Sequence, residues 1–237
     1  MTGTITHLAP AAVKRWVVSV IGSTVLTGGA MLVYPGGTQL DPTTRGYSIT
    51  QNFLSDLGTT VAFDGRSNAI GALCFVSALA LLLAGALGLL NAVRRLHDGV
   101  PRARHWSRAA IAVGIAVCVA FAGVALTPED RDMALHVRFT VLAFRLVPLV
   151  ALLLAGAAFA DTRLPRTVGV GWLVLSVVLI VYVVELQFAP STASLRGLTT
   201  QVIAQKLVVV SAVAVLLAQS VLLSRRSGVP DTTVHPV

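Results

Sequence analysis

The chain has 237 residues, of which 55% are hydrophobic and only 12% are charged, and its mean hydropathy is +0.82. This balance excludes an ordinary soluble domain and predicts an integral membrane protein. A net charge of +8 would suit a nucleic-acid partner, but the basic residues stand in short clusters between apolar runs without interleaved aromatic residues. We therefore expect no nucleic acid to be bound.

Six apolar stretches are long enough to cross a bilayer, which takes about 20 helical residues. They lie near residues 16–34, 67–92, 109–127, 138–160, 168–188 and 201–223. The first stretch follows Lys14 and Arg15 as a signal peptide would, but it reaches Tyr34 without a small-residue cleavage site, so we interpret it as a span. The prediction is an all-α, polytopic bundle of six transmembrane helices over residues 16–224.

Lysine and arginine gather on one side of this topology, which the positive-inside rule identifies as the cytoplasmic side. That side holds Lys14, Arg15, Arg94, Arg95, Arg102, Arg104, Arg108, Arg163, Arg166, Arg225 and Arg226. Both termini are then cytoplasmic. They comprise residues 1–15 and a tail at residues 225–237, which we expect to be disordered.

The longest stretch that is not apolar, residues 35–66, lies on the extracytoplasmic side. Its proline, glycine, aspartate and threonine residues predict turns rather than a second domain. A connector of about 30 residues is long, and loops of that length are usually functional or disordered. Most acidic residues also fall on this side, so the outer face is chemically richer than the inner one.

Beyond Arg138, which begins the fourth predicted span, three charged residues fall inside the predicted spans: Arg145, Glu185 and Lys206. A charge near the membrane centre costs roughly 3 kcal/mol, which favours an orientation toward the bundle interior and a partner there. Because a short loop joins the last two spans, Glu185 is the expected countercharge of Lys206. Asp56 is a competing partner for Lys206 or Arg145 if the long loop folds inward.

Two interpretations of these charges stay open. One is a set of ion pairs that only fixes helix packing. The other is a polar pocket in the outer half of the bundle, in which two cations hold a lipid phosphate or a carboxylate. The candidate ligand-binding residues are Asn52, Ser55, Asp56, Arg145, Glu185, Gln201, Gln205 and Lys206.

A possible acid/base set lies above this layer. It combines His136 with Asp56, Glu129 or Asp130 and requires the long loop to fold over them. The alternative is that His136 is an ordinary hydrogen-bonding residue at the interface. Since all other histidines are cytoplasmic in this topology, we expect no three-histidine metal site and no cofactor.

The segment NFLSDLG, residues 52–58, predicts a short helical or turn segment at the outer surface. Asn52 or Ser55 is suited to cap it, and Gly58 to end it. Asp56 would then either accept backbone N–H groups and hold the loop, or point inward.

Together with TPED at residues 127–130, His136 and the pair Gln205-Lys206, this segment carries a resemblance. Over roughly residues 15–225, the chain resembles the bacterial membrane proteins of domain-of-unknown-function family 998. More distantly, its layout is similar to the Frag1/DRAM/Sfk1 group of six-helix proteins, which are associated with lipid remodelling and membrane lipid organisation.

The resemblance implies a multi-pass protein of a bacterial plasma membrane, the inner membrane, with a lipid-related role but no particular reaction. In the family the cation of the last span is usually arginine. Lys206 lacks the planar fork of arginine, so two-point recognition of a ligand is not carried over to this position.

Three functions remain in competition. The leading one is a protein that binds or handles a lipid or other amphipathic molecule in a polar pocket open to the extracytoplasmic side. The second is a membrane-embedded enzyme that acts on a lipid or isoprenoid through Asp/Glu/His acid-base chemistry. The third is a non-catalytic scaffold with protein partners in the membrane, for which Ala84 and Gly88 have the small-residue spacing of close helix contacts.

Overall fold

The computed structural model describes residues 10–224. Its helices are α1 (Pro10–Val33), the short 3₁₀ helix η1 (Ser55–Gly58), α2 (Ala69–Leu96), α3 (Pro101–Leu126), α4 (Glu129–Ala160), α5 (Arg166–Phe188) and α6 (Leu195–Ser224). Six of these helices are long and apolar enough to cross a membrane. The predicted six-helix bundle of a multi-pass membrane protein is therefore confirmed. Residues 1–9 of the predicted N-terminal segment and the predicted tail at 225–237 lie outside the described residues.

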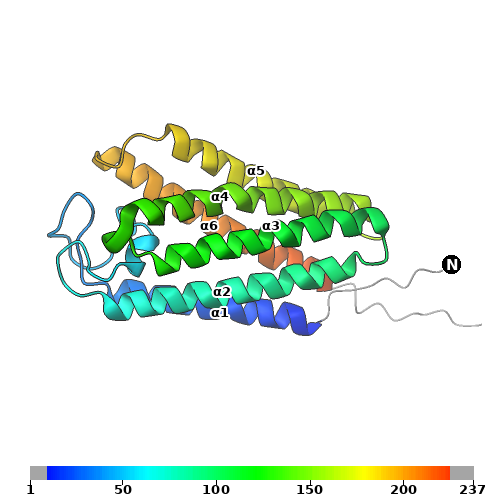
Figure 1. Ribbon diagram of the computed structural model, residues 1–237, viewed down its shortest axis with the longest axis horizontal. Coiled ribbons are helices and arrows are strands. Elements are labelled where there is room, and N and C mark those ends of the chain that lie inside the picture. The colour runs from blue at the N-terminus through cyan, green and yellow to red at the C-terminus, as the bar shows by residue number, and fades with distance from the viewer. Residues whose placement is uncertain (1–9, 225–237) are drawn as a thin grey trace, which may run out of the picture.

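The helices pack as an elongated bundle in which α1 lies along α2, α3 along α4, and α4 along α5 (Figure 1). α4 is the most enclosed helix, with half of its most apolar window buried. Large apolar side chains cover the outside, and Leu32, Leu126 and Phe188 are each at least 79% exposed. Such a surface would be an aggregation hazard in water, but it suits contact with lipid chains.

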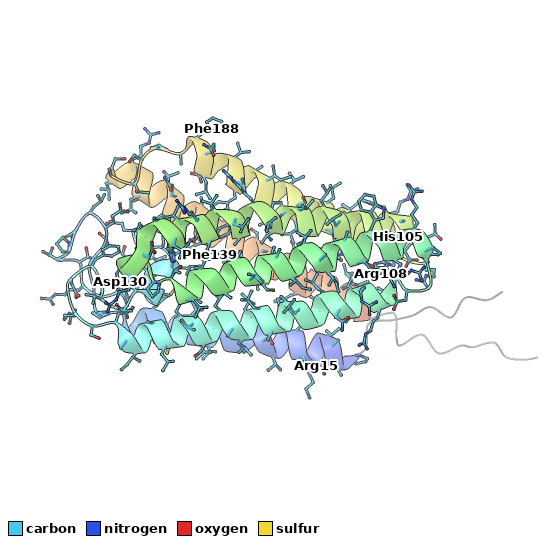
Figure 2. The ribbon with its side chains drawn as sticks, viewed as in Figure 1. Arg15, His105, Arg108, Asp130, Phe139 and Phe188 are labelled. Atoms are coloured by element: carbon cyan, nitrogen blue, oxygen red, sulfur yellow. The ribbon has the colours of Figure 1, made fainter. Side chains whose placement is uncertain are left out.

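The bundle has two chemically different ends (Figure 1). Residues 34–68, the α3–α4 turn and the α5–α6 connection lie at one end, which we call the loop end. The start of α1 and the α2–α3 and α4–α5 connections lie at the other, which we call the basic end. Figure 2 shows Asp130 at the loop end and Arg15, His105 and Arg108 at the basic end.

The segment at residues 34–68 is folded rather than extended. Gly37 has a φ of +82°, and a Cβ at this position would lie 2.5 Å from the backbone nitrogen of Asp64, so glycine is required for this close approach. Leu57 is fully buried beside Ala30, Tyr34 and Ala62, and this small apolar cluster seats the segment on α1.

The first turn of α4 is set at an angle to the rest of that helix. Asp132 has a non-helical backbone with φ −150° and ψ 80°. Its Oδ1 accepts a hydrogen bond of 2.9 Å from the backbone N–H of Leu135, as a helix-capping residue does. The polar turn before it, which starts at Glu129, therefore belongs to the loop end, although the apolar span was predicted to begin only near residue 138.

At the basic end, a buried group of charges joins two connections. The Asp161 carboxylate lies 2.9 Å from His97 Nδ1 and accepts hydrogen bonds of 2.8 Å from Arg163 Nε and Nη2. Arg163 Nη2 also donates to the backbone oxygen of Leu96 at 2.9 Å. The α2–α3 and α4–α5 connections are thus fastened to each other.

Candidate functional site at the loop end

Asn52 and Asp56 form the centre of the loop end and are both buried. Asp56 Oδ2 accepts hydrogen bonds from Asn52 Nδ2 at 2.9 Å and from the Phe53 backbone N–H at 3.0 Å. Asn52 Oδ1 accepts from the Ser48 backbone N–H at 2.9 Å, and its Nδ2 also donates to the Gly37 oxygen at 3.1 Å. The two side chains therefore hold three parts of the loop together.

The predicted short helix in NFLSDLG is present as η1 and ends at Gly58 as predicted, but the predicted N-caps Asn52 and Ser55 are wrong. The residue at the N-cap is Leu54, and no side chain caps the helix. Asn52 is occupied with the loop contacts above, and the half-buried Ser55 side chain makes no hydrogen bond to another described residue. Asp56 instead accepts a backbone N–H, which is the loop-holding role considered for it.

α6 reaches the loop through two neighbouring side chains. Gln205 Oε1 accepts a hydrogen bond of 2.8 Å from the Leu54 backbone N–H. Lys206 Nζ donates to the Asn52 backbone oxygen at 2.5 Å and lies 5.3 Å from the centre of the Tyr47 ring. Tyr47 donates its hydroxyl to the same oxygen at 2.9 Å. The intramembrane cation is thus paired with a loop carbonyl and an aromatic face.

The expected ion pair between Lys206 and Glu185 is not formed. Both carboxylate oxygens of Glu185 are buried without a hydrogen-bond partner among the described residues. The reason is that the loop folds against α6, which brings the backbone oxygen of Asn52 to Lys206. A carbonyl supplied by a folded loop leaves no sequence signal of opposite charge.

Two other candidates lie away from this centre. The Arg145 side chain is exposed on α4 and makes no hydrogen bond or ion pair with residues 10–224. Gln201 Nε2 donates to the Pro190 oxygen at 2.8 Å and so fastens the α5–α6 connection. The structure therefore does not bring Arg145 and Lys206 together as a two-cation pocket.

Asp130 joins the first turn of α4 to the loop. Its carboxylate accepts hydrogen bonds from the Thr60 N–H at 2.9 Å, the Thr60 hydroxyl at 2.5 Å and the Val61 N–H at 3.1 Å. Arg131 Nε donates to the Thr60 hydroxyl at 3.0 Å. With both oxygens occupied in this way, Asp130 acts as a clasp and is a poor candidate for acid-base chemistry.

His136 and Glu129 form a different pair. His136 is 4% exposed, and its Nδ1 lies 2.7 Å from the Thr127 backbone oxygen. A carbonyl oxygen only accepts, so Nδ1 carries a hydrogen, and in the neutral ring Nε2 holds the lone pair. Nε2 lies 3.9 Å from Glu129 Oε2 and has no hydrogen-bond partner in the described chain.

Glu129 also lines a surface groove of about 530 Å³. The opposite wall is the returning part of the loop, from Thr59 to Gly65, and Met133 adds an apolar side chain. The groove gives solvent or a ligand a route to the Glu129 carboxyl.

Tyr34, Asp56, Glu129, His136 and Lys206 make up what we call the loop-end cluster. Electrostatic interactions join Asp56 to Glu129, to Lys206 and to Tyr34, and the His136–Glu129 contact completes the set. Two buried polar atoms in it, Asp56 Oδ1 and His136 Nε2, have no hydrogen-bond partner among the described residues. The buried Tyr34 hydroxyl interacts there only with the backbone of Phe63 and with nearby carboxyl groups. Buried polar atoms of this kind are uncommon and call for a ligand, a water or a chemical role.

Burial raises the pKa of Asp56 well above its usual range, and the neighbouring Glu129 carboxyl raises it further. The hydrogen bonds from Asn52 and Phe53 and the charge of Lys206 lower it without offsetting the burial. Burial, followed by the Asp56 charge, also raises the pKa of Tyr34. The cluster is therefore an environment in which Tyr34 stays a neutral hydroxyl and Asp56 readily holds a proton.

Sequence reasoning found Asn52, Asp56, Glu129, His136 and Lys206 but missed the two tyrosines, Tyr34 and Tyr47. Both lie at a boundary, one at the end of the first span and one in the loop, where a tyrosine is common for its amphipathic ring alone. Among residues 10–224, no three His, Cys, Asp or Glu side chains are grouped as a metal site would require.

Comparisons with protein-family models, with curated proteins and with solved structures give no match for this chain. The fold described above is therefore the basis for the assignment as a multi-pass, six-helix membrane protein.

Proposed function

We propose that this membrane protein binds the polar head of a lipid or other amphipathic molecule at the loop-end cluster, with the apolar part of the ligand among or against the helices. The observation that carries the proposal is a group of buried polar side chains, Tyr34, Asp56 and His136, in which Asp56 Oδ1 and His136 Nε2 have no partner in the described chain. They come from the residue after α1, from η1 and from α4, and their neighbour Glu129 lines a groove.

The chemistry of these atoms favours a particular type of head group. A tyrosine hydroxyl donates, His136 Nε2 accepts when neutral, and Asp56 Oδ1 accepts or, when protonated, donates. Arg145 is exposed elsewhere and Lys206 is engaged with the loop, so cations for a phosphate or carboxylate are not gathered here. A head group with hydroxyl or amino groups fits this set better than an anion.

The test is lipid mass spectrometry on protein purified gently from its native membrane. Tyr34→Phe is the informative variant, because it removes only a hydroxyl, whose one hydrogen-bond contact in the described chain is with the backbone of Phe63, so the fold should be kept. Arg145→Gln is the matched control, since Arg145 lies outside the cluster. We expect one enriched lipid class in the wild type and in Arg145→Gln that is depleted in Tyr34→Phe. Equal lipid content in all three would refute the proposal.

The fixed tautomer of His136 supports a second candidate, an enzyme that uses Glu129 and His136 as acid and base on a membrane lipid or isoprenoid. Thr127 holds Nδ1–H, so Nε2 faces Glu129 with its lone pair. Glu129 in turn lines the groove from which a substrate would approach, while His136 lies buried behind it. For this candidate, Glu129→Gln and His136→Gln should alter the cellular lipid profile while the folded protein remains in the membrane. An unchanged profile in both variants would exclude it.

For orientation and location, we propose that the loop end faces the extracytoplasmic side of a bacterial inner membrane. The excess of lysine and arginine at the basic end supports the orientation, and the motif resemblance to family 998 supports the bacterial membrane.

A further inference from the structure

A second groove lies between α1 and α2 at the basic end, far along the bundle from the loop-end cluster. Its volume is about 760 Å³. Ser19 of α1 and the small residues Gly85 and Gly88 of α2 line it. A Cβ at Gly85 would lie 2.5 Å from the Ser19 side chain, whereas a Cβ at Gly88 would meet nothing within 4 Å. The helices therefore touch at Gly85, and a free channel opens beside Gly88.

Three cations line the same groove: Lys14 and Arg15 of α1, and Arg95 of α2. All three side chains are exposed, and none forms a hydrogen bond or ion pair with another residue of the described chain. Their neighbour Arg94 differs, because it is paired with Asp98 at 3.2 Å. No acidic residue lines the groove, so its positive charge is not balanced by the described part of the protein.

Lys14 and Arg15 stand in the second turn of α1, and Figure 2 shows Arg15 near the basic end of the bundle. An anion at this place would be stabilised by both side chains. The membrane surface is also where the phosphate of a phospholipid lies, while an acyl chain continues along the apolar helix surface.

We infer that this groove binds one acidic phospholipid of the adjoining leaflet. Its phosphate would contact Lys14, Arg15 and Arg95, and one acyl chain would lie along the channel beside Gly88. The inference does not depend on the function proposed for the loop-end cluster, which lies at the other end of the bundle.

Trp16 provides a reporter for this site. A Cβ at Gly85 would lie 3.1 Å from the Trp16 ring, so the buried ring lies directly behind Gly85, a residue of the groove wall. A Trp106→Phe, Trp172→Phe protein keeps Trp16 as its single tryptophan. It is placed in phosphatidylcholine vesicles that contain increasing fractions of either brominated phosphatidylglycerol or brominated phosphatidylcholine, and quenching of its fluorescence is recorded. We expect half-maximal quenching at a phosphatidylglycerol fraction about tenfold below that for phosphatidylcholine, since several cations face one head group.

Two variants locate the effect. Lys14→Gln, Arg15→Gln, Arg95→Gln together should abolish the preference for phosphatidylglycerol, whereas Arg94→Gln, the neighbouring and already paired cation, should keep it. Gly88→Leu should also abolish it by filling the channel, and a Cβ at this position meets no protein atom within 4 Å. Equal quenching by the two lipids would overturn the inference, and so would a preference that survives in Gly88→Leu.

Because Trp172 is part of the buried core, a second measurement uses a protein that keeps all three tryptophans. Native mass spectrometry of the otherwise unmodified chain, with an equal mixture of the two unbrominated lipids, measures the same preference. A bound phosphatidylglycerol that is lost in the triple-glutamine protein and kept in Arg94→Gln supports the site. The same lipid occupancy in both contradicts it.

Discussion

At the scale of single residues, the main finding is that Lys206 is held by a backbone oxygen and a tyrosine ring, and that the acidic residue with which it interacts electrostatically is Asp56 of the loop rather than Glu185. The sequence identifies the charge as unusual, because lysine is rare inside a span. It does not identify the partner, since every residue of a long loop has a carbonyl oxygen and only the folded loop selects Asn52. From the sequence alone, Glu185 was the expected partner of Lys206, because it is the acidic residue of the neighbouring span.

This assignment predicts opposite effects for two substitutions. Lys206→Met should lower the free energy of unfolding by about 1–3 kcal/mol, because it leaves the buried Asn52 oxygen with one donor fewer. Glu185→Gln should be neutral or stabilising, because it removes a carboxylate whose oxygens are buried without a partner in the described structure. Thermal unfolding in detergent measures both. If Lys206 and Glu185 were paired, both substitutions would destabilise the protein by a similar amount.

A second residue-scale prediction concerns two neighbours on the first turn of α4. Asp130→Asn should release the loop, because the carboxylate accepts three hydrogen bonds from Thr60 and Val61. Loss of these charge-assisted bonds should cost about 1–3 kcal/mol and speed hydrogen exchange at both backbone amides. Glu129→Gln should leave this exchange unchanged. Equal exchange in the two variants would show that Asp130 is not the clasp.

At the scale of elements, the length of the apolar stretches predicted the six spans, because a run of about 20 apolar residues is typical of a transmembrane helix. The polar ends of the helices were not predicted, since a helical turn outside the membrane has no hydropathy signal. α4 shows this most clearly: its first turn carries Glu129 and Asp130 into the site, and Asp132 then caps the apolar part. The contact between His97 and Asp161 at the basic end was also not predicted, because the two residues lie far apart in the sequence.

That buried group predicts a pH dependence of stability. Burial lowers the pKa of His97, against the raising effect of Asp161. Burial raises the pKa of Asp161, but the hydrogen bonds from Arg163 and His97 outweigh this, so the pKa is lowered overall. Both folded-state pKa values thus lie below their ordinary values, and on acidification the unfolded chain takes up protons first.

Stability should therefore fall as the pH drops below about 6.5, the ordinary histidine value, and fall again below about 4. Thermal unfolding at a series of pH values tests this, with His97→Gln as the comparison. The variant should lose the first decline and keep the second. Because burial raises the pKa of Asp56, that carboxyl adds stability on acidification, so the difference between the two proteins decides. The same change in stability between about pH 7 and about pH 5 in wild type and His97→Gln would contradict the role of His97.

At the scale of the whole molecule, the two ends carry different chemistry and define an orientation. The loop end should be extracytoplasmic and the basic end cytoplasmic. With Cys74 and Cys118 replaced by alanine, Thr50→Cys and Thr162→Cys place one exposed cysteine at each end. A membrane-impermeant maleimide should label intact cells only through Thr50→Cys. Labelling of Thr162→Cys alone would reverse the orientation, and with it the side from which the loop-end cluster is reached.

The central claim is that the loop-end cluster binds a polar head group. It is tested most directly by the thermal unfolding temperatures of wild type and Tyr34→Phe, each measured with native lipid retained and after delipidation. A bound ligand stabilises only the folded state. We predict that the loss of the Tyr34 hydroxyl, with its contact to the Phe63 backbone, changes the unfolding temperature of the delipidated protein only slightly. We also predict that native lipid raises the unfolding temperature of the wild type more than that of Tyr34→Phe. An equal rise in both proteins would contradict the claim.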